Sequence, residues 1–188
     1  VLRSGQTWRA RACNVPHDWT RAYQWMSGEM RARLGQPANA WQSPIWVWCQ
    51  WRGATRAQPD LRARGHLPTG TCGVRIELDL DDARLLLSDF ELWHYVLNGW
   101  YLPTSLADEG PFNARPDRRR IAASWKRVFD LDWLNRRNTA ARSASSIQGV
   151  TWELRPGDVR GATTFTAQFR VPGGTTIRCV MHGALFEM

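Results

Sequence analysis

One segment of the 188-residue sequence, residues 88–103, combines side chains that could do chemistry. His94 and Asn98 stand four residues apart, so on a helix they would share a face with Phe90. A histidine beside an amide can orient a substrate or act as a general base. A boundary histidine satisfied by a backbone carbonyl would give the same pattern, and both interpretations remain open.

A carboxylate stands near the end of a mostly apolar strand that is predicted over residues 147–154. On this strand Glu153 shares a face with Thr151, because successive side chains alternate between the two faces. A carboxylate in this position could stabilise a positive charge that develops in a substrate. It could equally be the solvated charge that commonly protects an edge strand.

Indole rings gather in the run at residues 44–51, which is β-branched, aromatic and bounded by proline and glycine, and so is predicted to be a strand. Trp46 and Trp48 point the same way along it and could stack on a nicotinamide, an adenine or another base, a contact worth ~1–3 kcal/mol per base. Trp93 and Tyr101 are expected to line the same ligand site. Core packing is the alternative, since a covered Trp buries ~150–250 Å².

The elements that must position these residues follow from periodicity and from start and stop signals. Asp18 is the predicted N-cap of the first helix, and Ser88 with Glu91 forms a predicted capping box for the second. The predicted helices cover residues 19–34, 89–98 and 117–131, and the predicted strands cover residues 44–51, 74–80, 84–87 and 147–154, with a long loop at 52–73 and a hairpin at 164–181. Helices and strands do not alternate strictly, which favours an α+β fold, a single domain with three helices packed on a mainly antiparallel mixed sheet.

Composition limits the class of protein further. The chain is long enough to bury a core without disulfides, and its hydrophobic content of 43% does not fit wholesale disorder. The four cysteines and four histidines show no metal-ligand spacing, so no metal cofactor is expected. Scattered cysteines, with no leader-like or membrane-spanning apolar run, predict a cytoplasmic location.

Two features of the composition are unusual, the charge and the tryptophan content. The formal net charge is +8, and the aromatic residues comprise Trp 12, Phe 6 and Tyr 3. Cations with flat rings suit nucleic acid. The basic residues are dispersed, however, and all but Lys126 are arginine. A non-catalytic, arginine-driven nucleic-acid-binding module is therefore the alternative function.

The run Leu-Ser-Asp-Phe-Glu-Leu-Trp-His-Tyr-Val-Leu-Asn-Gly-Trp-Tyr-Leu-Pro at residues 87–103 resembles a bacterial family of small standalone proteins classed as a domain of unknown function. Residues 44–51, 74–78, 125–131 and 147–154 are also similar to that family. The resemblance implies a bacterial origin and one family-like globular domain over residues 1–160, with residues 161–188 as a C-terminal hairpin or tail. It implies no particular activity.

The order of the candidate residues is similar to that in ADP-ribosyltransferases. In those enzymes an N-terminal strand presents Arg or His, an inner strand presents aromatic or hydroxyl residues, and a later strand presents a Glu that stabilises the cation formed as nicotinamide leaves. The resemblance implies NAD as the ligand. Arg3 or Arg9 would contact its phosphates, and Glu153 with His94 would be catalytic.

Overall fold

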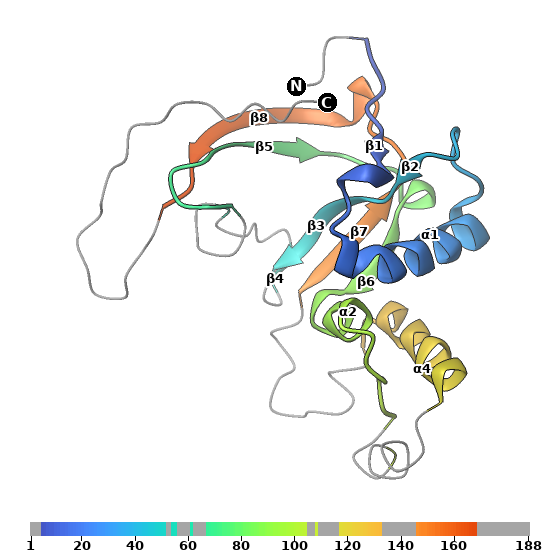
Figure 1. Ribbon diagram of the computed structural model, residues 1–188. Coiled ribbons are helices and arrows are strands. Elements are labelled where there is room, and N and C mark those ends of the chain that lie inside the picture. Colours follow the sequence, from blue (N-terminus) through green and yellow to red (C-terminus); the bar gives the residue numbers. More distant parts are fainter. Residues whose placement is uncertain are drawn as a thin grey trace. The chain divides into compact units, whose positions relative to one another are not determined.

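The computed structural model describes residues 5–51, 54–55, 61, 67–104, 108, 117–132 and 146–168. The chain divides into two compact units. The smaller unit contains Val1–Gln6, Pro59–Leu80 and Arg155–Met188, and the larger unit contains Thr7–Gln58 and Asp81–Leu154. The described residues form three α-helices and antiparallel strands (Figure 1), which confirms the α+β class.

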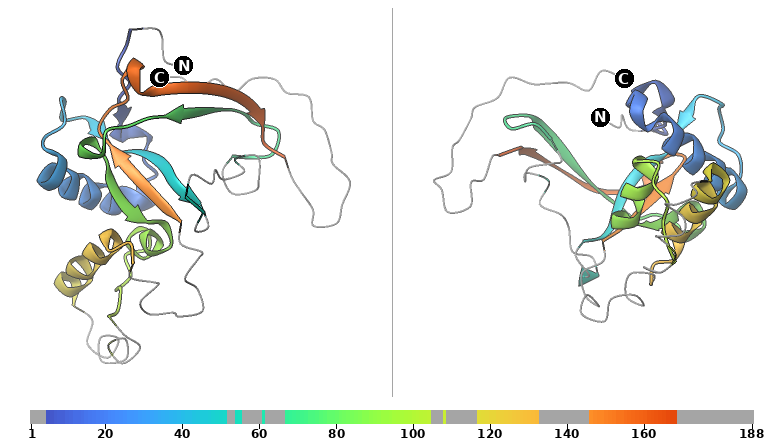
Figure 2. Two further views of the ribbon diagram at one scale, coloured as in Figure 1. Left: turned by 180° about the vertical axis from the view of Figure 1, so that it is seen from behind. Right: turned by 60° about the horizontal axis from the view of Figure 1, so that its bottom comes forward.

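A four-stranded antiparallel sheet organises the larger unit. Its order is β4-β3-β7-β6, with β3 at Ile45–Trp51, β4 at Ala54–Thr55, β6 at Leu86–Asp89 and β7 at Ile147–Thr151. Strand β7 lies between β3 and β6 (Figure 2), although it comes from the far end of the unit's sequence. A separate short pair joins β1, Ala10–Arg11, to β2, Gln42–Ser43.

Glycine is required at the centre of β7. A Cβ atom on Gly149 would stand 2.6 Å from Leu85 Cδ1 and 3.2 Å from Cys49 Sγ. The Leu85 and Cys49 side chains therefore occupy the space that any larger residue at position 149 would need. The close approach is a packing requirement rather than a turn requirement, because Gly149 is not among the glycines with positive φ.

Three helices complete the larger unit: α1 at Thr20–Leu34, α2 at Phe90–Leu97, and α4 at Arg118–Ser124, which continues as a 3-10 turn over Trp125–Phe129. Helix α1 ends at Gly35, whose φ of 86° suits glycine. The predicted cap of α1 is wrong, because Asp18 lies in the 3-10 turn His17–Trp19 and Trp19 is the N-cap.

The predicted capping box of α2 is also wrong. Ser88 belongs to β6, where it pairs with Gln148, and Asp89 caps the helix by accepting a hydrogen bond from the Leu92 N–H at 3.0 Å. The strand therefore continues one residue beyond Ser88, the predicted cap, and the acidic side chain of Asp89 becomes the cap.

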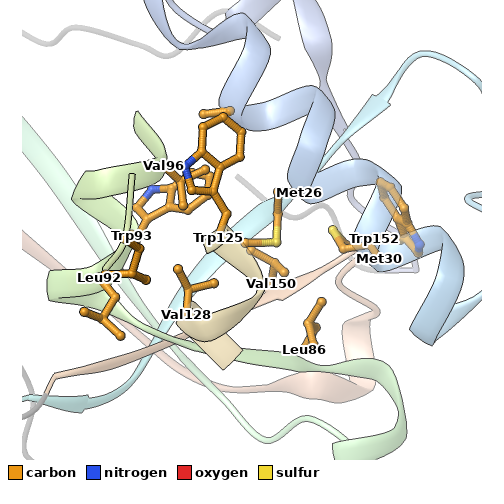
Figure 3. Packing of buried hydrophobic residues seen from close by; sticks show 12 residues of the cluster. Met26, Met30, Leu86, Leu92, Trp93, Val96, Trp125, Val128, Val150 and Trp152 are labelled. Atoms are coloured by element: carbon orange, nitrogen blue, oxygen red, sulfur yellow. The ribbon is translucent and has the colours of Figure 1, made fainter. Parts of the chain in front are cut away.

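The hydrophobic core of the larger unit is rich in tryptophan and methionine (Figure 3). Met26 and Val128 are fully buried, and Trp125 is 1% exposed. Two contacts fix the position of the Trp125 side chain. Its Nε1 donates a hydrogen bond to the Trp100 carbonyl at 2.7 Å, and its ring meets the Trp25 ring edge-on with the ring centroids 5.6 Å apart. The cluster joins α1, α2 and the turn after α4 to strand residues such as Val150.

The smaller unit contains a two-stranded ribbon in which β5, Cys72–Leu78, pairs antiparallel with β8, Val159–Thr166. Residue 161, where the sequence places the start of a tail, lies inside β8. The rest of the predicted hairpin, residues 169–181, lies outside the described residues. The Val74 side chain on β5 is 42% exposed. Within the described parts of the chain, no helix is long and apolar enough to cross a membrane.

The packing around Gly149 predicts the outcome of one substitution. Gly149→Ala should lower the free energy of unfolding by ~1–3 kcal/mol, the usual cost of overpacking. The matched control is Gly28→Ala in the interior of α1, where an added Cβ meets nothing within 4 Å. Because alanine is the better helix former, Gly28→Ala should raise stability by ~0.5–1 kcal/mol. Urea denaturation measures both, and equal effects would contradict the packing requirement.

Candidate functional site

A cluster of partly exposed aromatic rings lies where β3 meets the start of α2. We call Trp48, Trp51, Phe90 and His94 the aromatic cluster. The Phe90 ring lies 4.7 Å from the Trp48 ring and 4.7 Å from the His94 ring, and the Trp48 ring meets Trp51 edge-on at 4.9 Å. His94 is exposed, and the other three rings are partly exposed. The cluster is thus accessible from solvent at its His94 end.

Two members of the aromatic cluster, Trp51 and Phe90, were not expected to bind a ligand. Alternation along β3 predicts that Trp51 points away from Trp48, but the register with β7 shifts between Trp48 and Gln50. A shift of one residue moves the following side chains to the other face. No feature of the sequence marks this irregularity, so Trp51 was assigned to the wrong side.

Two polar side chains continue the row of Trp48 across the sheet. Gln148 is directly opposite Trp48 on β3 and directly opposite Ser88 on β6. Residues opposite one another in a sheet project from the same face. Ser88 is 0% exposed and Gln148 is 6% exposed, and neither Ser88 Oγ nor Gln148 Nε2 has a hydrogen-bond partner among the described residues.

His94 and Asn98 both bond to the backbone of α2. His94 Nδ1 lies 3.0 Å from the Phe90 carbonyl oxygen, and Asn98 Nδ2 donates to the His94 carbonyl at 2.7 Å. The carbonyl only accepts, so Nδ1 carries the proton, and in the neutral ring Nε2 is then an acceptor. The backbone thereby orients the His94 ring, and the Asn98 side chain bonds to the backbone carbonyl of His94 at the end of the helix.

The structure places Trp93 and Trp46 in the packed interior. Trp93 is 4% exposed, and its ring lies 4.6 Å from the ring of Trp46, which packs against the core cluster. Tyr23 meets both rings edge-on, at 5.8 Å from Trp46 and 6.1 Å from Trp93. Burial raises the pKa of Tyr23. Core packing therefore accounts for both indoles.

Arg9 and Glu153, distant in sequence, form an ion pair. Arg9 Nη2 lies 2.7 Å from Glu153 Oε2, with side chains 30% and 19% exposed. A backbone bridge between Trp8 and Leu154 brings the two segments together. Arg84 Nη2 also donates to the Glu153 carbonyl at 3.2 Å. Arg3 lies outside the described residues.

The structure does not bring this ion pair to the aromatic cluster. Glu153 is five positions after Gln148, which corresponds to at most ~16 Å along an extended chain. In addition, Glu153 follows Thr151, which pairs with Ile45 at one end of the β3–β7 ladder, whereas Trp48 pairs with Gln148 toward the other end. His94 and Trp48 therefore share one location, and Arg9 and Glu153 share another.

Tyr101 is bound within a polar cluster of its own. Its hydroxyl donates to Asp108 Oδ2 at 2.7 Å, and the guanidinium of Arg120 lies 5.6 Å from its ring centroid. The hydrogen bond from Tyr101, with others from Thr104 and the charge of Arg120, lowers the pKa of Asp108 to about 2. Tyr101 thus anchors Asp108. Over the described ranges, no three His, Cys, Asp or Glu side chains are grouped to hold a metal ion.

Fold and site together define an α+β protein with a half-exposed aromatic cluster at a strand-to-helix junction. A family model described as a domain of unknown function (DUF3841) matches residues 13–118, more than half of the chain. The chain belongs to this family, which confirms the expectation of a domain of unknown function. A search of curated proteins finds no match, and neither does a search of solved structures.

Asp89, which joins the sheet to α2, gives a pH-dependent prediction. Burial raises the pKa of this carboxyl, although the backbone amides of Leu92 and Glu91 lower it in part. Its pKa is thus higher in the folded than in the unfolded protein, so ionisation of Asp89 destabilises the fold. This loss of stability is absent below the pKa of Asp89 in the unfolded protein, which is ~4. It grows as the pH rises and is complete above the pKa of Asp89 in the folded protein.

Asp89→Asn keeps an oxygen for the cap and removes the charge, so it should raise the free energy of unfolding relative to wild type more at pH 7 than at about pH 4. Asp89→Ala is the control, because it removes the cap as well and should be less stable than Asp89→Asn by ~1 kcal/mol at either pH. Denaturant titrations at several pH values measure both. A benefit of Asp89→Asn that is the same at every pH would contradict the assignment.

Proposed function

We propose that this protein binds a nucleotide-type ligand at the aromatic cluster, with NAD as the ligand and ADP-ribosyl transfer as the reaction. The observation that carries the binding step is the contact of Trp48 and His94 with Phe90 at a partly exposed surface. Aromatic rings that are neither fully buried nor isolated offer faces and edges for a planar heterocycle. His94 Nε2 adds an acceptor at the exposed end.

The transfer step assigns Glu153 to charge stabilisation. The bond between ribose C1′ and the pyridinium nitrogen of NAD breaks, and nicotinamide leaves with the electron pair. A nucleophile on the acceptor then bonds to C1′ and releases its proton. The positive charge that develops on the ribose during this step would be stabilised by the Glu153 carboxylate, which Arg9 orients.

The separation of Glu153 from the aromatic cluster limits which ligands could bind at the cluster and also react at Glu153. A mononucleotide bound at Trp48 could not also present its ribose to Glu153. A dinucleotide carries two rings joined through two riboses and a pyrophosphate, so one ring can stack at the cluster while the other end reaches further. In such a pose one ring of the dinucleotide would occupy the cluster and the rest of the ligand would extend toward Glu153. The geometry supports the binding step more directly than the transfer step.

Arginine-driven binding of single-stranded nucleic acid is the second candidate, favoured by a different surface of the larger unit. The guanidinium of Arg11 lies 5.1 Å from the ring centroid of Trp41, which is 45% exposed. Trp8, near the same β1 strand, is 38% exposed. Exposed indoles beside arginines suit base stacking and phosphate neutralisation.

Thermal shift separates the two candidates. NAD should raise the melting temperature of the wild type, and Trp48→Leu should abolish that rise because it removes the indole on which a ligand ring would stack. Trp100→Leu is the matched control, since Trp100 is 58% exposed and contacts Tyr95 instead. Stabilisation by a single-stranded oligonucleotide that falls with salt, without any by NAD, would favour the second candidate instead.

Glu153→Gln tests the transfer step. It should leave the NAD-induced thermal shift intact and reduce nicotinamide release by two or more orders of magnitude, since a neutral amide cannot stabilise the ribosyl cation. Glu29→Gln is the control, because Glu29 is also a partly buried carboxylate in an ion pair, with Arg33 one turn along α1. Nicotinamide release at the wild-type rate in Glu153→Gln would exclude the proposed role.

A further inference from the structure

We propose that Ser88 and Gln148 form the floor of a subsite that binds the carbonyl oxygen on the edge of a planar ring, while Trp48 and Phe90 bind its faces. The inference rests on the binding step of the proposed function and specifies it, because it states which ring chemistry the aromatic cluster would accept. It does not depend on the transfer step at Glu153. Trp48, Gln148 and Ser88 occupy one row across β3, β7 and β6. The row ends beside the start of α2, two residues before Phe90.

The two polar atoms on this floor lack partners in an interior where partners are the rule. Ser88 Oγ and Gln148 Nε2 each expose less than 1 Å² and make no hydrogen bond within the described structure. Most buried side-chain polar atoms in proteins are bonded, and an unbonded one lowers stability. Asp89 Oδ2 and Trp46 Nε1, on the same two strands as Ser88 and Trp48, also lack a partner among the described residues. Buried Ser124 follows the rule, because its Oγ donates to the Ile121 carbonyl and accepts from the Leu102 N–H.

The chemistry of the two atoms selects the ligand. A carboxamide nitrogen donates only, and a hydroxyl can donate to any acceptor that faces it. Ser88 and Gln148 are directly opposite across the sheet, so their Cβ atoms stand ~4.5–5.5 Å apart and both donors can reach one oxygen. A carbonyl oxygen has two lone pairs and can accept both bonds. The floor therefore suits a nicotinamide, a uracil or a guanine, and not an adenine, whose ring edge carries no carbonyl.

Access to the floor requires movement of a side chain, because the two polar atoms are covered in the free protein. In this proposal Trp48 or Phe90 rotates away from its partner to admit the ligand ring. The ring contacts that would break are those of the cluster itself, including the 4.7 Å contact between Trp48 and Phe90. A ligand ring stacked between Trp48 and Phe90 would contact both rings. These contacts would replace the contact that the two rings make with each other in the free protein.

Three variants and three probes test the inference. Ser88→Ala and Gln148→Met remove one unpartnered atom each at little change in shape, and Ser124→Ala removes a serine hydroxyl that is fully bonded. The probes are nicotinamide mononucleotide, uridine monophosphate and adenosine monophosphate. Melting temperatures are measured with and without each probe, and dissociation constants are measured by tryptophan fluorescence.

The expected result is that a carbonyl-bearing probe stabilises the wild type and adenosine monophosphate does not. Ser88→Ala and Gln148→Met should bind that probe about tenfold or more weakly, the effect of losing one hydrogen bond. They should nevertheless melt at the wild-type temperature or above without ligand. Ser124→Ala should melt lower and keep the wild-type affinity.

Three outcomes would overturn the inference. They are unchanged affinity in both Ser88→Ala and Gln148→Met, equal binding of adenosine monophosphate, and no stabilisation by either carbonyl-bearing probe. Failure of the proposed function looks different. If uridine monophosphate binds, loses affinity in the two variants, and neither NAD nor nicotinamide mononucleotide binds, then the floor is confirmed and NAD is not the ligand.

Discussion

The position of β7 between β3 and β6 is the constraint on which the larger unit depends. Residues 147–150 of this strand each have a partner on both β3 and β6, so the face on which each side chain lies decides which residues share a row across the sheet. The row of Val150 contains Trp46 and Leu86 and belongs to the core. The next row on that face contains Trp48, Gln148 and Ser88. Gly149, between the two, leaves space on the opposite face for Leu85 and Cys49.

Helix α2 serves the core and the candidate site with different faces. Leu92, Trp93 and Val96 are buried, whereas Phe90 and His94, one turn apart, contact the aromatic cluster. The helix can begin at this point because Asp89 caps it directly after the strand. That cap is buried, and its second oxygen has no partner in the described part of the chain. Burial of this oxygen without a partner lowers the stability of the strand-to-helix junction. The same junction places Phe90 beside Trp48.

The candidate residues that resembled an ADP-ribosyltransferase set occupy two places. Arg9 and Glu153 meet because the segment before β1 forms a bridge with the chain after β7. Trp48 and His94 meet at the other end of β7, through Phe90. A ligand short enough to bind at one place does not reach the other. This separation makes binding at the cluster and transfer at Glu153 independent questions, although the sequence had combined them in one site.

Local patterns in the sequence determined much of this protein. The three-and-four-residue spacing of apolar residues placed α1 within a residue of its observed start, and β-branched and aromatic runs placed β3 and β7. The α+β class followed from the order of these elements. The family-like run at residues 87–103 also indicated where to look for a site. Each of these signals lies within about a dozen consecutive residues, so it needs no knowledge of neighbours in space.

Tertiary structure decided which of the similar residues face a ligand. Trp46 and Trp48 are two positions apart on one face of β3, yet Trp46 packs against Trp93 in the core and Trp48 packs against Phe90 at the surface. The register shift after Trp48 brought Trp51 to the cluster, and the pairing of Ser88 with Gln148 made Asp89 the helix cap. The sequence could not reveal these outcomes, because burial and register depend on which distant segment covers a residue.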